Sequence, residues 1–208
     1  MIVSASYRTD IPAFYGDWFM NRLRAGHAMV ANPYSAKPYR VSLLPVDVDG
    51  FVLWTRNIRP LMENLTEIQQ VAPFILQMTV TGYPRAVETS VIAASQAVSD
   101  MKQVAGRFGP RSVVWRYDPL LITSLTPVDW HLENFTRLAQ QLAGVTDEVV
   151  VSFTHVYAKT RRNLDAAAQA GGSFTWNDPS VPEKRQVLQQ LAGISSQYGM
   201  RLTLCSQP

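Results

Sequence analysis

The chain has 208 residues, 47% of them hydrophobic, with a formal net charge of +3 at pH 7 and a single cysteine, Cys205. This length and apolar content allow about 70% of the unfolded surface to be buried in one domain over residues 1–208, and one cysteine excludes an intramolecular disulfide or a tetrathiolate site within the chain. The start of the chain shows no charged leader before an apolar segment, and no apolar run is long enough to span a bilayer, so we expect a cytoplasmic protein without a membrane partner.

Strands are predicted where short runs rich in Val, Ile, Phe or Leu are bounded by turn residues. The predicted strands cover residues 2–6, 27–31, 51–55, 74–80, 112–116, 148–154 and 200–205. The proline-containing segment 32–50 predicts a long loop with room for one short extra strand at residues 41–44.

Helical spacing of apolar residues fills most of the intervals between these strands. It predicts helices at residues 11–25, 87–107, 157–170 and 182–198, and a further helix from Thr126 to Gly144. Asp10 is the expected N-cap of the first helix and Gly26 its stop. Thr126 is expected to cap its helix through its hydroxyl, with a proline and then an acidic residue following.

The alternation of strands and helices implies a parallel sheet with right-handed crossovers. Seven strand candidates favour an α/β fold of the partial or near-complete parallel (β/α) TIM-like barrel type. A doubly wound sheet is the alternative.

Three apolar runs end in an arginine followed by a polar turn with a proline a few residues on. Because ligands of parallel α/β folds bind at the carboxyl ends of the strands, we expect Arg8, Arg56 and Arg116 to converge on one polar site. Guanidinium groups bind phosphate and carboxylate through paired donors, so a small anionic ligand is expected there. The same strand ends would add three polar side chains, Ser6, Asn57 and Ser152.

Asp10 and Asp118 each lie two residues after one of these arginines. Either each Arg–Asp pair neutralises itself, or a partly unpaired carboxylate carries out acid–base catalysis, and both interpretations stay open. His155 ends a strand and is the histidine best placed for proton transfer, with a structural role as the alternative. His27 and His131 are expected to be structural, and no spacing of metal-ligating residues resembles a zinc site.

Several of these segments together resemble the bacterial family known as domain of unknown function 1848. The resemblance covers the whole chain and is carried by residues 4–15, 54–57, 81–83, 114–119 and 152–153, with Tyr157 and Lys159. Arg56 stands where a lysine is expected in the family's Trp-Thr-Lys-Asn run, which keeps the charge but argues against a Schiff-base role.

The resemblance implies a relative of radical S-adenosylmethionine enzymes whose iron–sulfur cluster is bound by cysteines near the C-terminus. Cys205 resembles one of those cysteines, but a single thiolate does not hold a cubane cluster. We therefore expect that the chain is truncated after Pro208, that it binds no such cofactor by itself, and that the cluster and S-adenosylmethionine belong to the complete protein. The arginines would then hold the carboxylate of S-adenosylmethionine or an anionic substrate.

Two other functions stay open. A cofactor-free barrel enzyme or binding protein for a phosphorylated or carboxylated small molecule would use the three arginines as clamps and Asp118 or His155 as the base. A nucleic-acid-binding module fits the basic charge and the aromatic residues, but the scattered distribution of the charges argues against it.

Overall fold

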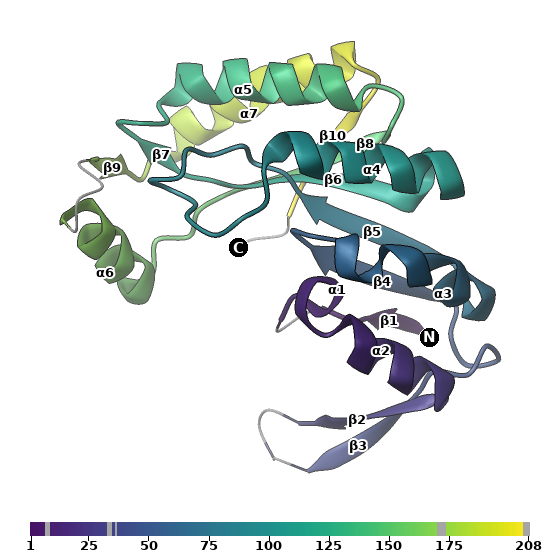
Figure 1. Ribbon diagram of the computed structural model, residues 1–208. Coiled ribbons are helices and arrows are strands. Elements are labelled where there is room, and N and C mark those ends of the chain that lie inside the picture. The colour runs from purple at the N-terminus through teal and green to yellow at the C-terminus, as the bar shows by residue number, and fades with distance from the viewer. Residues whose placement is uncertain (7–8, 33–34, 36, 170–173, 206–208) are drawn as a thin grey trace. The chain divides into compact units, whose positions relative to one another are not determined.

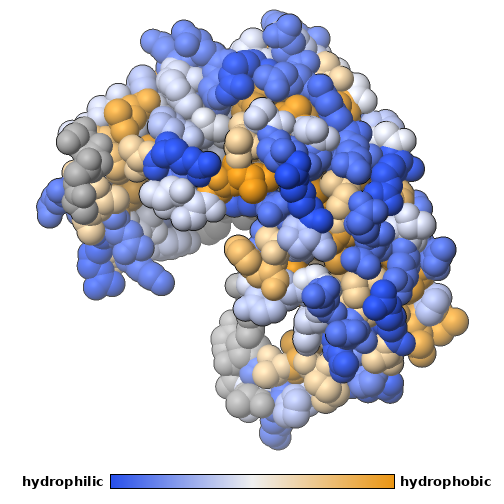
Figure 2. All heavy atoms as spheres, viewed as in Figure 1, coloured by the Kyte–Doolittle hydropathy of each residue, from blue (hydrophilic) through white to orange (hydrophobic). Residues whose placement is uncertain are grey.

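The computed structural model describes residues 1–6, 9–32, 35, 37–169 and 174–205, and Figure 1 labels its helices and strands. The chain forms two compact units, unit 1 over Met1–Met78 and unit 2 over Thr79–Pro208. In the face shown in Figure 2, hydrophilic residues cover much of the surface and hydrophobic residues form separate patches. No helix among the described residues is long and apolar enough to cross a membrane.

Unit 1 is built on three parallel strands in the order β1-β4-β5. Its elements are β1 (Ile2–Ser4), α1 (Ile11–Phe14), α2 (Gly16–Arg24), β2 (His27–Ala31), β3 (Pro38–Ser42), β4 (Gly50–Thr55), the 3-10 helix η1 (Arg59–Asn64), α3 (Leu65–Val71) and β5 (Phe74–Thr79), whose last residue begins unit 2. Buried Phe51 and Leu53 alternate with half-exposed residues along β4, which places them in the core. The strands predicted at residues 2–6, 51–55 and 74–80 are confirmed.

The helix predicted at residues 11–25 is two helices, because the backbone at Tyr15 is not helical (φ −132°, ψ 28°). Pro12 is buried before this break, and Phe19 and Leu23 are buried after it. Apolar spacing therefore continues across the break and does not reveal it. The end of the second helix is confirmed at Gly26, whose φ of +70° is the left-handed conformation that favours glycine.

The strand predicted at residues 27–31 exists as β2, but the prediction that it joins the parallel sheet is wrong. It forms an antiparallel hairpin with β3, with His27 opposite Ser42 and Ala31 opposite Pro38. The physical reason is the connection, since residues 32–37 are too few for the crossover that a parallel pair needs. The extra strand of this region is confirmed, starting earlier than residues 41–44 and ending at Ser42.

Neither η1 nor α3 was predicted from the sequence. Their buried side chains, Leu61, Leu65 and Ile68, lie three and four residues apart along one helical face. The segment is short, and it begins in a 3-10 helix whose second residue is Pro60, so the helical period is weak at the level of sequence.

Unit 2 contains a second set of three parallel strands in the order β6-β8-β10. Its elements are α4 (Ala94–Phe108), η2 (Pro110–Ser112), β6 (Val113–Leu120), β7 (Ile122–Thr123), α5 (Val128–Leu142), β8 (Glu148–Phe153), α6 (Ala158–Ala167), β9 (Trp176–Asn177), α7 (Val181–Gln197) and β10 (Arg201–Leu204). Nearly every residue of β6 and β8 is buried, as expected of parallel strands covered on both faces. Figure 1 shows α5 and α7 side by side, in agreement with their contacts.

The α/β class is therefore confirmed, with three parallel strands in each unit and helices between them. The TIM-like barrel is not confirmed, because the described residues form no closed barrel. The additional pair β7–β9 is antiparallel and short, with Thr123 opposite Trp176.

Helix boundaries in unit 2 differ from the prediction, and three of the starts have a clear physical reason. The helix expected to begin at residue 87 begins at Ala94, because the Arg85 side chain donates to the carbonyls of Thr89 and Val91 (3.2 and 2.6 Å) and holds that segment in a turn. The expected hydroxyl cap at Thr126 is wrong, since its Oγ1 donates instead to the carbonyl of Leu121 (3.0 Å). The last helix starts with a capping box formed by Ser180 and Glu183, which stabilises it from one residue earlier than predicted.

Candidate functional site

Arg116 and Asp118 form a buried ion pair on β6. Arg116 Nε donates to Asp118 Oδ1 (3.0 Å), and Nη2 contacts Oδ2, so the pair is bidentate. Only 8% of the Arg116 side chain and 11% of the Asp118 side chain are exposed. Residues two apart in a strand point to the same face, which explains how consecutive sequence produces this pair.

The electrostatics of this pair keep the guanidinium charged. Burial by itself would lower the pKa of Arg116, but the hydrogen bonds and negative charge of Asp118, with a smaller contribution from Cys205, outweigh it and raise the pKa above its ordinary value. The geometry thus matches the interpretation in which Arg116 and Asp118 neutralise each other. A catalytic role for Asp118 stays a prediction.

Two further side chains reach this pair from the neighbouring strands. Ser152, on β8, places its Oγ within 3.5 Å of Asp118 Oδ2, and Cys205, after β10, places its Sγ 3.6 Å from Arg116 Nη2. The backbone N–H of Cys205 donates to the carbonyl of Val151 (3.1 Å), which fixes the residue beside β8. We call Arg116, Asp118, Ser152 and Cys205 the strand-end cluster.

Three members of the strand-end cluster were expected as site residues from the sequence, and Cys205 was not. The signal for Cys205 was its position as the final residue of the last predicted strand, because the carboxyl ends of parallel strands place ligand-binding groups. The contact with Arg116 spans 89 positions of sequence and depends on the order of the strands. Spacing along the chain does not encode such a contact.

His155 follows β8 and stacks on the ring of Tyr157, with ring centroids 4.8 Å apart and planes 11° from parallel. The preceding residue, Thr154, donates its backbone N–H to the carbonyl of Leu120 (2.8 Å). These contacts place the histidine on the segment that leads into α6. The role of His155 in proton transfer that the sequence suggested stays a prediction.

In unit 1, the carboxylate of Asp10 is engaged by the backbone. Its Oδ1 accepts from the N–H of Ala13 (3.0 Å), which confirms it as the N-cap of α1, and its Oδ2 accepts from the N–H of Arg56 (2.8 Å). Asp10 therefore joins the start of α1 to the end of β4. Asn57 shapes the next turn, since its Oδ1 accepts from the N–H of Arg59 (3.2 Å).

Ser6 is buried, and its hydroxyl has no hydrogen-bond partner among the residues that the structure describes. Arg8 lies outside the described residues. Arg56 belongs to unit 1 and Arg116 to unit 2. The convergence of the three arginines on one site therefore stays a prediction.

A neutral hydrogen-bond network that the sequence did not reveal lies on the opposite face of β6. His131 Nε2 lies 3.1 Å from the carbonyl of Leu121, which can only accept, so Nε2 carries the proton and Nδ1 accepts from the hydroxyl of Tyr117 (3.0 Å). Asn134 Nδ2 donates to the same hydroxyl (3.0 Å) and to the carbonyl of Thr81 (2.7 Å).

Burial dominates the acid–base properties of this network. It lowers the pKa of His131 to about 4, against a smaller opposing effect of the hydrogen bond to Leu121, and it raises the pKa of Tyr117. The histidine is therefore neutral at pH 7. Its place in the core agrees with the structural role expected from the sequence.

Within the described ranges of the chain, no three His, Cys, Asp or Glu side chains gather in a way that could hold a metal ion. A comparison with curated proteins finds no match. The model of a family described as a domain of unknown function, DUF1848, matches residues 2–208. This agrees with the resemblance seen in the sequence motifs, and since the match spans nearly the whole chain, the protein belongs to the DUF1848 family.

Proposed function

We propose that this chain is the α/β part of an enzyme that acts on a small anionic molecule at the strand-end cluster. The observation that carries the proposal is the buried, bidentate pair of Arg116 and Asp118, in contact with Ser152 and Cys205 where three parallel strands end. The partial (β/α) barrel expected from the sequence remains part of this proposal.

The energetics of the pair support a function beyond stability. Removing two charges from water is expensive, and well-packed apolar residues often replace a buried ion pair at no loss of stability. The presence of such a pair at the carboxyl ends of parallel strands is therefore best explained by a role in binding or catalysis there. Arg116 would orient Asp118, and Asp118 would orient the hydroxyl of Ser152 toward a bound substrate.

The family resemblance supports a more specific proposal for a longer form of the protein, a radical S-adenosylmethionine enzyme. An iron–sulfur cluster is bound by several cysteine thiolates, and this chain supplies only Cys205, so its residues do not fit the cluster by themselves. Further cysteines encoded after Pro208 would support this proposal, and a stop codon directly after Pro208 would contradict it.

Cys205 provides the test of the anion site, because alkylation of the chain's only cysteine reports on one position. The rate of alkylation by iodoacetamide, followed by intact mass, would be measured with inorganic phosphate, malonate and S-adenosylmethionine. At least one of these anions should slow the reaction in a saturable way. Ser152→Ala should weaken that protection about threefold to tenfold, since it removes one hydrogen bond near a charged group.

Arg201→Lys is the matched control. Arg201 lies on β10, the strand directly before Cys205 in the chain, but its side chain pairs with Glu148 at the surface (3.8 Å). It should leave the protection unchanged. If none of the three anions alters the alkylation rate or gives heat on titration, the strand-end cluster does not bind anions, and the proposal fails.

A further inference from the structure

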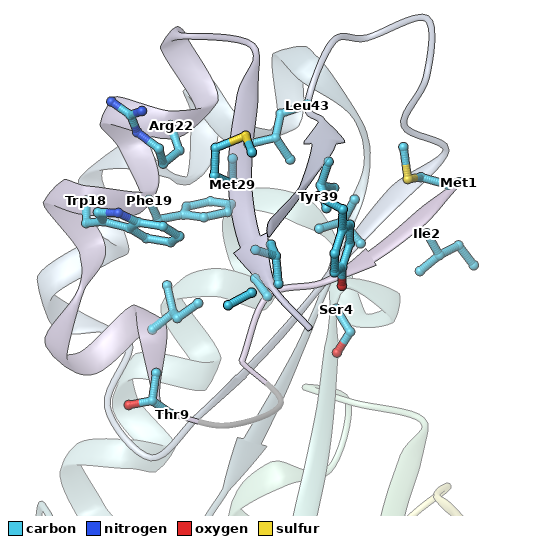
Figure 3. Close-up of a pocket in the computed structure, with 17 residues that line it drawn as sticks. Met1, Ile2, Ser4, Thr9, Trp18, Phe19, Arg22, Met29, Tyr39 and Leu43 are labelled. Carbon is cyan, nitrogen blue, oxygen red and sulfur yellow. The ribbon is translucent and has the colours of Figure 1, made fainter. Parts of the chain in front are cut away.

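A cavity lies in unit 1, and no residue of the strand-end cluster lines it. Its volume is about 570 Å³, within the roughly 300–1,000 Å³ that is usual for small-molecule pockets. Figure 3 shows its walls, which come from β1, α2 and the β2–β3 hairpin. Its larger lining side chains are Trp18, Phe19, Met29, Tyr39 and Leu43.

The cavity leaves large apolar side chains uncovered. Trp18 is 45% exposed, Met29 55% and Tyr39 51%, and all three line the same space. Single exposed apolar residues are ordinary, but a contiguous group of them around a hollow is typical of a binding site. An apolar molecule of suitable size would cover these surfaces.

Most of the lining residues lie in helices and strands, so these parts of the wall are preformed. The ring of Phe19 packs edge-to-face on Phe51 of β4 (centroids 5.8 Å apart, planes at 89°), which anchors α2 to the parallel strands. The hairpin is paired along its whole length, from His27 with Ser42 to Ala31 with Pro38. Little ordering is then needed on binding, which favours affinity.

Among the described residues, one cationic side chain, that of Arg22, lines this apolar cavity. Arg22 lies on α2 and makes no hydrogen bond or ion pair with the residues that the structure describes. Arg24, two residues later, differs because its Nε and Nη2 donate to the two carboxylate oxygens of Glu67 (2.7 Å each). In Figure 3 the guanidinium of Arg22 is turned away from the aromatic wall, as expected of a side chain that packs its stem on apolar surface and keeps its charge at the rim.

We propose that this cavity binds an amphipathic monoanion, a small molecule with an apolar body and one carboxylate or similar group. The apolar body covers Trp18, Met29 and Tyr39, and the anionic group lies at the rim beside Arg22. The charge of Arg22 decides between this class and a neutral apolar ligand, because an anion gains an ion pair there and a neutral molecule does not.

The test compares decanoate with decanol, which share the apolar chain and differ in the charged group. Calorimetric titrations of the full chain, below the concentration at which decanoate forms micelles, should show saturable binding of both, with decanoate tighter. Arg22→Gln should weaken decanoate binding about twofold to fivefold, as for an exposed ion pair, and leave decanol unchanged. Arg40→Gln is the matched control, because Arg40 is an exposed arginine on β3 of the hairpin that forms one wall, but it does not itself line the cavity, and the change should alter neither affinity.

Ala31→Trp tests the place of binding, since Ala31 is exposed and lines the cavity, so a larger side chain there blocks the space without entering the core. It should weaken both ligands at least tenfold. The proposal is overturned if neither ligand binds, if Ala31→Trp leaves binding intact, or if Arg22→Gln and Arg40→Gln act alike. It is also overturned if sedimentation shows a dimer that Ala31→Trp dissociates, because a second copy would then cover the cavity.

Discussion

Replacing His131 with glutamine should make the free energy of unfolding less dependent on pH between pH 7 and pH 5. The reason is that His131 causes much of the loss of stability in this range. The pKa of His131 is lowered to about 4 in the folded protein, because the ring is buried, and is about 6.5 in an unfolded chain. As the pH falls below about 6.5, the unfolded state takes up a proton that the folded state does not, so the free energy of unfolding decreases. The decrease stops once the pH is below about 4, where both states are protonated.

The size of this effect follows from the two pKa values. A difference of about 2.5 pKa units corresponds to about 3 kcal/mol in full, and about 2 kcal/mol of that is lost by pH 5. The reason is specific to the site, since Nδ1 accepts from Tyr117 and an imidazolium would have no lone pair for that bond.

Urea denaturation followed by circular dichroism at pH 7, 6 and 5 measures the effect. The relevant quantity is the difference in unfolding free energy between wild type and His131→Gln at each pH, because other titrating groups cancel in that difference. We expect the advantage of the wild type at pH 7 to shrink by about 2 kcal/mol at pH 5. A difference that stays constant from pH 7 to pH 5 would refute the assignment of a buried, neutral His131.

Three further predictions concern stability and use the same measurement. Asp118→Asn should destabilise the fold by about 3–5 kcal/mol, because it removes the carboxylate charge that pairs with the buried guanidinium of Arg116. The double variant Arg116→Met, Asp118→Leu should lose far less, and equal losses would contradict the pairing. Asp10→Ala should cost about 2 kcal/mol, because two backbone N–H groups lose their acceptor, and a loss under about 0.5 kcal/mol would argue against this contact. Gly26→Ala should be more destabilising than Gly144→Ala, although both glycines have positive φ. A Cβ at Gly26 would lie 2.7 Å from a leucine side-chain carbon, whereas a Cβ at Gly144 would meet nothing within 4 Å. Equal effects would be evidence against that contact.

Much of the fold was predictable, because local signals and tertiary structure agree in the parallel strands and at the helix ends. Runs of β-branched residues located the strands, and Asp10 and Gly26 marked the limits of the first helical segment. The pairing of Arg116 with Asp118 was also readable, since a spacing of two in a strand places both side chains on one face.

The unpredicted features depend on contacts that local sequence does not carry. The break at Tyr15 interrupts an apolar pattern that continues on both sides, and the antiparallel pairing of β2 with the extra strand β3 was not predicted. Cys205 joined the site because β8 lies between β6 and β10, an order that is decided by packing. Nothing in the sequence indicated that His131 and Asn134 form hydrogen bonds with the hydroxyl of Tyr117.

The alternation of β6 has a consequence for the folding register of unit 2. Trp115 and Tyr117 face the aromatic core, where both rings contact Phe135 (4.7 and 5.1 Å between centroids), while Arg116 and Asp118 face the opposite side. A slip of one residue against β8 would drive the guanidinium and the carboxylate into the aromatic core and expose the two large rings to the polar side. A strand in this wrong register would bury charge in the aromatic core and would also lose its aromatic packing. The alternation of β6 therefore favours the correct register with β8 over the register one residue away.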